Sequence, residues 1–341
     1  MTLAAHEPAD WNNILSTTFH NYRDQLTDNI FESRPLLNFY MSNGRVRTVS
    51  GGISIVEPLM YQEGDFAAYT EWDRIEVTPV NTATAAQYQW KQLLATIAIS
   101  GLEEAQNNGK EQIVNLLEAK IMQAEDTLKT RLNQMLFGTY SGSDAANGFT
   151  SLKVLVADAA TEAGGIVNEA WWASQVNAVG SVDAAGLEAA MRGAYNAASD
   201  AGNDRVDALF TDAATFEFYE STLTPQVRYT DVEKANLGFQ NLMFKGVPIF
   251  WDFDCDAGEM YGLNSKYVGL CIHSDRNFKQ SPFSANLTGS VGSNSTDHAT
   301  PGTGSASASA LDARVSFIST YGEHTTRNRR RNFKLTGIAE A

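Results

Sequence analysis

The chain has 341 residues, of which 43% are hydrophobic, and it carries a formal net charge of −15 at pH 7. This length allows one large domain or two, and the composition favours a globular fold over disorder. The acidic excess argues against generic nucleic-acid binding, which needs a basic surface. It leaves open a protein that encloses nucleic acid without gripping it.

Signals for membrane insertion, secretion and disulfide or zinc chemistry are absent from the sequence. No stretch reaches the ~18 consecutive apolar residues of a membrane span. The N-terminal sequence MTLAAHEPADWNNIL has neither a basic n-region nor an apolar h-region, so we expect no secretory signal. The cysteines, Cys255 and Cys271, fit no zinc motif and are expected to be reduced, partly buried thiols.

The first 106 residues are predicted to contain an arm, a hairpin and a short helix. Residues 1–45 carry scattered apolar side chains without a single core face and predict an extended or loosely helical arm. Strand-forming residues at 46–56 and 75–80 flank a polar, aromatic stretch, Tyr61–Ile75, which indicates a long hairpin with a projecting loop. Residues 90–106 are interpreted as a short helix or turn.

The stretch 108–138 predicts one long amphipathic helix. Asn108 with Glu111 is typical of a capping box, Glu125 and Lys129 are spaced as an i, i+4 pair, and Gly138 is expected to end the helix. About 28 helical residues span about 42 Å, the length of a strut. The apolar face consists of Ile113, Leu117, Ile121, Ala124, Leu128, Leu132 and Met135, widened by Leu116 and Leu136.

The second half alternates strands and helices. The pattern predicts a strand around 166–176, a helix over 183–200, a strand over 206–212 that opens into a helix, and strands within 242–273 with a turn or edge at 246–248. Residues 284–310 are a Ser/Gly/Ala/Thr-rich stretch expected to be a flexible insertion. Two closing strands are expected within 314–321 and 331–338.

Two charged clusters are candidate sites. The run Asp252–Asp256 suggests a calcium loop, but Ala257 and Leu263 stand where such a loop needs Gly and Glu, so we interpret its carboxylates as one solvent-exposed strand face. The dense basic run is either a phosphate-binding patch or, as we favour, an interface that pairs with carboxylates of a neighbouring subunit. Its members are Arg327, Arg329, Arg330 and Arg331.

No catalytic or cofactor motif is present in the sequence. The five histidines do not cluster, and no GxSxG, Walker A, GxGxxG or HExxH pattern occurs. We therefore predict a protein that is not an enzyme and binds no cofactor or metal. The aromatic loop carries the residue types enriched at protein interfaces, and its candidate assembly residues are Tyr61, Glu63, Phe66, Tyr69, Trp72 and Arg74.

The order of these parts resembles the major capsid protein of tailed bacteriophages, the Hong Kong 97-type fold. The resemblance rests on the passage from hairpin to long helix (Trp72–Gly138), on FKGVPIFWD (Phe244–Asp252) and on MYGLN (Met260–Asn264). It implies an α+β fold with an arm at 1–45, and a 46–179 region that contains an extended loop (about 56–85) and a peripheral domain with spine helix 109–137. An axial domain at 180–272 and a return to the peripheral domain at 273–341, with the insertion 284–310, complete the plan.

The resemblance also implies a function. Such a protein assembles with itself as pentamers and hexamers into an icosahedral shell that encloses double-stranded phage DNA without sequence-specific binding. It implies a place in the virion, assembly in the host bacterial cytoplasm, and partners such as a separate scaffolding protein, a portal and a decoration protein, with no membrane partner. Residues 50–90 contain no lysine, so we expect none of the covalent cross-linking that some relatives show.

Two alternatives remain open at this point. An encapsulin-like nanocompartment shell shares the fold and differs by a docking groove for cargo peptides. An acidic hydrolase or a surface-layer protein shares the composition. A stubbornly monomeric protein would favour the hydrolase.

Overall fold

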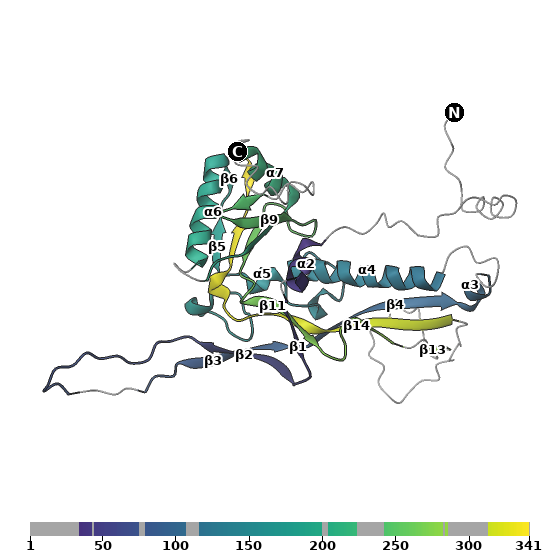
Figure 1. Ribbon diagram of the computed structural model, residues 1–341, viewed down its shortest axis with the longest axis horizontal. Helices are drawn as coiled ribbons and strands as arrows, with labels where there is room; N and C mark the ends of the chain where they lie inside the picture. Colours follow the sequence, from purple (N-terminus) through teal and green to yellow (C-terminus); the bar gives the residue numbers. More distant parts are fainter. Residues whose placement is uncertain are drawn as a thin grey trace. The chain divides into compact units, whose positions relative to one another are not determined.

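The computed structural model describes residues 34–42, 44–74, 79–106, 116–199, 204–223, 242–281, 284–285 and 313–340 (Figure 1). The chain divides into two compact units. The smaller contains Ile97–Gln123 and Phe283–Val315, and the larger contains Glu32–Thr96, Ala124–Pro282 and Ser316–Ala341. Most of the predicted arm and of the predicted insertion lies outside the described residues.

The smaller unit contains the end of β4 (Lys91–Ser100), α3 (Gly101–Gln106) and the start of α4 (Leu116–Phe137). Ser100 and Glu103 form a reciprocal capping box at α3: the Glu103 N–H donates to Ser100 Oγ (3.2 Å) and the Ser100 N–H donates to Glu103 Oε2 (3.1 Å). Lys120 of α4 then joins the Glu103 carboxylate at 2.7 Å. In the same unit, β13 (Ser284–Ala285) pairs antiparallel with the start of β14 (Ala313–Thr326).

The helix or turn predicted over 90–106 is wrong for residues 91–100, which form strand β4. Leu93, Ile97 and Ile99 are buried there while the residues between them are partly or fully exposed. This period of two is the strand signature. The apolar pair Leu93-Leu94 conceals it in the sequence, because Leu94 lies on the outer face and is 61% exposed. Only the last part of the segment, α3, is helical.

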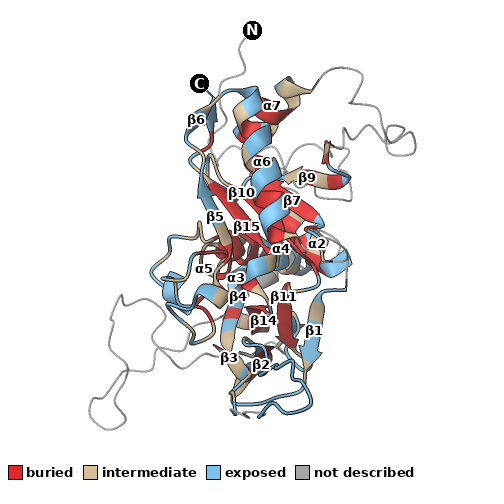
Figure 2. Cartoon of the chain, turned by 90° about the vertical axis from the view of Figure 1, so that its left-hand side faces the viewer, coloured by how far each residue is buried: buried red, intermediate tan, exposed pale blue. Residues whose placement is uncertain are grey.

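The larger unit is built on a six-stranded mixed sheet with strand order β5-β15-β10-β7-β9-β8. Its two central strands, β7 and β10, are buried at every residue, as strands covered on both faces must be (Figure 2). Helices α6 and α7 pack on this sheet through a core that includes Leu187, Met191 and Phe218. The bounds are β5 Gln175–Ala178, α6 Ala184–Ala198, β7 Ala208–Thr211, α7 Ala213–Thr222, β8 Met243–Phe244, β9 Val247–Trp251, β10 Met260–Leu263 and β15 Phe333–Thr336.

The sequence predicted most of this region. Asp183 caps α6, accepting from the Gly186 N–H at 2.9 Å, and β7 opens directly into α7 as expected. The turn at Lys245-Gly246, with positive φ at both residues, joins β8 and β9. The strand predicted around 166–176 is wrong in its first part, because Trp171 and Trp172 lie in a 3₁₀ turn and β5 begins only at Gln175.

A second sheet in the larger unit places β1 (Val46–Val49) parallel to β11 (Val268–His273), which pairs antiparallel with β14. The hairpin of β2 (Ser54–Met60) and β3 (Ala83–Gln89) forms a two-stranded sheet of its own. The remaining elements are α2 (Pro35–Ser42), η2 (Ala145–Asn147), α5 (Leu152–Leu155), η3 (Ala170–Trp172), β12 (Lys279–Gln280), η4 (Arg329–Arg331) and the pair β6 (Ser181–Val182) and β16 (Ala339–Glu340).

The predicted spine helix is α4, described from Leu116 onward. Its capping box at Asn108 and Glu111 lies outside the described residues. Gly138 ends the helix with φ +81°, and a Schellman pair of bonds forms there, from Thr139 N to Gln134 O (2.9 Å) and from Gly138 N to Met135 O (3.1 Å). The expected Glu125–Lys129 pair is replaced by a contact of Lys129 with Asp126 at 3.5 Å.

The buried face of α4 generates a stability prediction. Leu132 is 1% exposed and Met122, on the same helix, is 53% exposed. We expect Leu132→Ala to lower the free energy of unfolding of the unassembled chain by about 2–5 kcal/mol, because it leaves a cavity in a packed core. Met122→Ala, the control, should change it by less than about 0.5 kcal/mol. Urea denaturation followed by circular dichroism measures both, and equal effects would contradict the burial of Leu132.

Candidate assembly surfaces

The β2–β3 hairpin buries one face and exposes the other. Ile55 and Leu59 of β2 and Ala86 and Tyr88 of β3 pack against a cluster that contains Leu155 and Trp172. The outward residues of β2 are also apolar: Val56 is 45% exposed, Pro58 is exposed and Met60 is 83% exposed. A two-stranded ribbon with an apolar outer face is typical of a surface that another protein covers.

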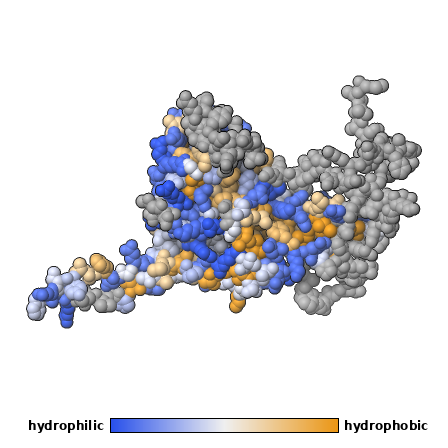
Figure 3. Space-filling model, viewed as in Figure 1, coloured by the Kyte–Doolittle hydropathy of each residue, from blue (hydrophilic) through white to orange (hydrophobic). Residues whose placement is uncertain are grey.

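The loop between these strands carries the predicted assembly residues. Residues 62–74 are all exposed, with Phe66 at 89%, Tyr69 at 66% and Trp72 at 94%, and Glu63 and Arg74 lie among them. This loop is the extension at the left of Figure 3, where hydrophobic and hydrophilic residues are mixed. Tyr61 is half-buried and lies 5.3 Å from the ring of Trp171. The structure therefore brings the loop candidates together in one segment, and Tyr61 at its start contacts Trp171 outside the loop.

A tight turn shapes the tip of this loop. The Asp73 carboxylate accepts from the Thr70 N–H (2.9 Å) and the Thr70 hydroxyl (2.8 Å), and the Asp73 N–H donates to Thr70 O (3.1 Å). These hydrogen bonds lower the pKa of Asp73. The turn leaves Glu71 and Trp72 at its apex.

The four predicted basic residues do not form one patch. Arg329 is fully buried, and its guanidinium donates to three backbone carbonyls: Leu155 O (2.9 Å), Thr161 O (3.1 Å) and Val154 O (2.8 Å). The prediction that the Arg329 side chain pairs with another subunit is wrong, because its guanidinium is buried and already donates to carbonyls of its own chain. Arg327 is half-exposed, Arg331 is partly buried and Arg330 is exposed.

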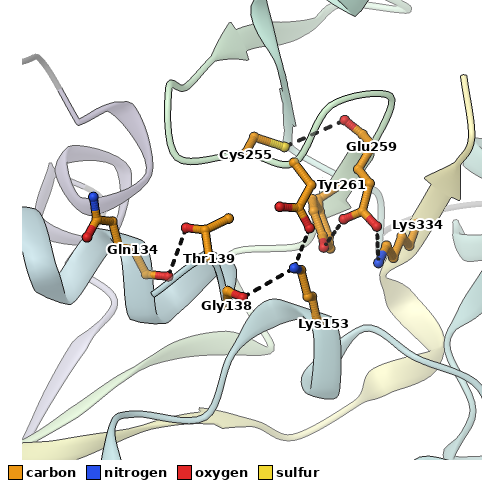
Figure 4. A network of polar contacts seen from close by, with 9 residues as sticks. Gln134, Gly138, Thr139, Lys153, Cys255, Glu259, Tyr261 and Lys334 are labelled. Atoms are coloured by element: carbon orange, nitrogen blue, oxygen red, sulfur yellow. Dashed lines mark hydrogen bonds and ion pairs between the residues drawn. The ribbon is translucent and has the colours of Figure 1, made fainter. Parts of the chain in front are cut away.

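The acidic run is also not the solvent-exposed strand face that we predicted. Asp252 is 2% exposed and accepts from the Asn133 side chain of α4 (3.0 Å), while Asp254 accepts from the same amide (2.6 Å). Burial raises the pKa of Asp252. Asp256 pairs with Lys153 of α5, which also donates to Gly138 O at 3.2 Å (Figure 4). The run therefore joins α4 and α5 to the segment that follows β9.

The same network continues into the mixed sheet. Glu259 accepts from the hydroxyl of Tyr261 (2.6 Å) and pairs with Lys334 of β15 (2.7 Å), as Figure 4 shows. No group of acidic, histidine and cysteine side chains suited to a metal ion occurs within the described ranges. Among the helices that the structure describes, none is both long and apolar enough to cross a membrane.

A buried polar cluster near β14 was missed by the sequence reasoning. The His324 ring is fully buried between the hydroxyl of Tyr40 (2.9 Å) and Thr150 O (3.0 Å), and burial lowers its pKa from 6.5 to about 4. Glu323 accepts from the Thr150 N–H at 2.6 Å, and burial raises its pKa. Tyr40 and His324 are 284 positions apart, so no local sequence pattern announces their contact.

A polar pocket lies beside the hairpin base. Glu57 of β2, 3% exposed, is held by Arg47 (2.5 Å) and Arg327 (3.0 Å). Arg45, Lys266 and Tyr267 line the pocket with them. Two guanidinium groups thus fix the one carboxylate that β2 points inward.

The chain resembles known proteins in structure but not in sequence. No family model and no curated protein matches it. A chain of the Cyanophage A-1(L) capsid asymmetric unit matches with a TM-score of 0.64 and 17% identity over 96% of this chain and 99% of that one. A chain of the capsid of a native GTA particle matches at 0.62 and 11% identity, over 98% and 100%.

A chain from a structure described as Mycobacterium phage Bobi matches at a TM-score of 0.56 and 14% identity, over 97% of this chain and 98% of that one. The likeness runs along almost the whole chain in each case. The predicted mixed α+β fold of the Hong Kong 97 capsid type is thereby confirmed.

The buried His324 generates a pH prediction. Its folded pKa of about 4 lies below 6.5, so the folded chain binds the proton less tightly than the unfolded chain. Its stabilising contribution is present above pH 6.5 and should be lost as the pH falls towards 4, by about 3 kcal/mol. His324→Gln, which keeps a donor and an acceptor, should remove this part of the pH dependence. Unfolding of both proteins between pH 4 and pH 7 measures the difference, and parallel profiles would refute it.

The buried Arg329 generates a second prediction. Arg329→Lys should lower the free energy of unfolding by about 3 kcal/mol, because an ammonium group cannot reach all three carbonyls and leaves buried acceptors unpaired. The adjacent exposed Arg330 provides the control, and Arg330→Lys should cost less than about 0.5 kcal/mol. Thermal denaturation of the two variants compares them. A mild effect at Arg329 would mean that its hydrogen bonds contribute little.

Proposed function

We propose that this chain is the major subunit of a capsid of the tailed-phage or GTA type, a non-catalytic shell protein. Copies assemble as pentamers and hexamers into a closed icosahedral shell around double-stranded DNA. The observation that carries the proposal is the β2–β3 hairpin: it exposes an apolar outer face and a loop of aromatic residues on a chain that matches a phage capsid structure over 96% of its length. Such a surface is typical of an interface that another copy covers.

The proposal assigns a role to each region. Residues 1–45 form an arm that reaches neighbours, and the loop at about 56–85 lies on an adjacent subunit. The region 46–179 with the spine helix and the returning residues 273–341 form the peripheral domain, while 180–272 form the axial domain. Many weak, repeated contacts sum to a stable shell by multivalency, without covalent cross-links.

The net charge of −15 supports the proposal that the shell encloses DNA without binding it tightly. An acidic wall repels the phosphate backbone, so densely packed DNA slides rather than sticks. A separate scaffolding protein, a portal and a decoration protein are proposed partners. The mature shell is part of the virion, and assembly takes place in the host bacterial cytoplasm.

Electron microscopy of the purified chain, alone and with its scaffolding partner, tests the proposal. Wild type should give rings of five or six copies or closed shells. The double variant Phe66→Ser/Trp72→Ser should assemble at least about tenfold less well, because two large exposed anchors are lost from each contact.

The melting temperature of the unassembled double variant should equal that of wild type, because both side chains are solvent-exposed. This control separates a lost interface from a damaged fold. A wild-type chain that stays monomeric at every salt and concentration, with and without scaffold, would overturn the proposed function. Regular shells that form without scaffold and carry an enzyme would favour the nanocompartment.

A further inference from the structure

The pocket beside the hairpin base has more positive charge than its own carboxylate neutralises. It has a volume of about 130 Å³, and Arg45, Arg47, Lys266 and Arg327 supply four cationic groups against Glu57. Arg47 and Arg327 pair with Glu57, yet their side chains remain 47% and 52% exposed. Each guanidinium has five N–H donors, so donors remain available to a further acceptor.

Arg45 is the cationic side chain of this pocket that is best placed to bind a further anion. Lys266 pairs with Asp204 at 2.7 Å, whereas Arg45 has no ion pair among the described residues and is exposed. A guanidinium group matches the planar, two-oxygen face of a carboxylate. Glu57 already occupies one wall and would repel a polyanion such as nucleic acid. A single carboxylate is therefore the ligand that fits.

The loop tip carries an exposed carboxylate. Glu71 lies at the apex of the turn that Thr70 and Asp73 close, next to Trp72, and it makes no ion pair with any residue that the structure describes. Because the turn is fixed by three hydrogen bonds, Glu71 loses little conformational freedom on binding. The adjacent indole supplies the large aromatic surface common in interface anchors.

The occupant of the pocket comes from another copy. Every residue from 62 to 74 is exposed, so the tip is not seated on its own chain. The ladder from Ser54↔Gln89 to Met60↔Ala83 holds the two strands extended between the hairpin base and the loop. A tip on one surface and a pocket on another make a heterologous contact, the kind that closes into rings.

We propose that the pocket of Arg45, Arg47 and Arg327 binds the Glu71 carboxylate of a second copy of this chain. The inference rests on the proposed self-assembly and adds the residues that make the contact. The excess positive charge of the pocket receives the Glu71 carboxylate, which has no ion pair among the described residues. Repeated around a ring, each copy gives one carboxylate and receives one.

Chemical cross-linking of assembled particles tests the contact. The variant Glu71→Cys/Arg45→Cys, treated with a short bismaleimide, should give a series of covalently linked chains on a denaturing gel. The native thiols do not interfere, because Cys255 and Cys271 are buried, at 6% and 1% exposed. The control pair Glu71→Cys/Glu188→Cys, with the second cysteine on the exposed face of α6, should give no such series.

A charge exchange gives the second readout. Glu71→Arg and Arg45→Glu should each reduce particle yield about tenfold, since like charges then meet in every contact of the ring. The double variant should recover most of the yield. Particles that form without the cross-linked series, or a double variant as poor as the singles, would overturn this contact and leave the shell function standing. Failure of wild type to assemble at all would overturn both.

Discussion

The larger unit depends on a pair of hydrogen bonds from one buried amide. Asn133, fully buried on α4, donates to Asp252 and Asp254 after β9, and Asp252 in turn lies 3.5 Å from the Leu36 N–H of α2. Apolar packing alone allows a helix to slide on a sheet, because it has no preferred register. A buried amide with two carboxylate acceptors fixes one register, since any shift leaves charged oxygens unpaired.

Similar polar contacts join other distant segments of this unit. Arg329 joins η4 to the carbonyls around α5, and His324 joins β14 to α2 and to Thr150. Each contact has a desolvation cost that is recovered only in one geometry. In the proposed shell each subunit repeats the same contact many times, so it needs this uniqueness more than it needs extra stability. An error in the angle between elements would be repeated at each interface and would prevent closure.

Local signals in the sequence predicted several elements correctly. Asp183 lies at the start of α6 and Gly138 at the end of α4. Each helix end is fixed by hydrogen bonds within a few residues, so a local sequence pattern is sufficient to predict it. The sequence pattern failed to predict β4, because the exposed Leu94 beside the buried Leu93 conceals the alternation of apolar and polar residues that marks a strand.

The candidate site divides in the same way. Exposure of the aromatic loop follows from its lack of aliphatic residues, and the sequence predicted it. The burial of Asp252 and Arg329 depends on partners more than 100 positions away, Asn133 in one case and the carbonyls of Val154, Leu155 and Thr161 in the other. A charged run looks the same in sequence whether its groups face water or backbone, so the local pattern could not separate Arg329 from Arg330.

Pro58 limits non-specific strand pairing at the exposed edge of β2. Strand β2 pairs with β3 on one side and leaves its other edge unpaired by any strand that the structure describes. Proline has no N–H, so within a regular ladder it must place its nitrogen on that outer edge. A strand from another chain that pairs with the outer edge of β2 therefore lacks a hydrogen-bond donor at Pro58, in the middle of that edge. In the proposed assembly, subunits accumulate before a shell forms, and this interruption disfavours fibrous aggregation while the apolar face stays available for another copy.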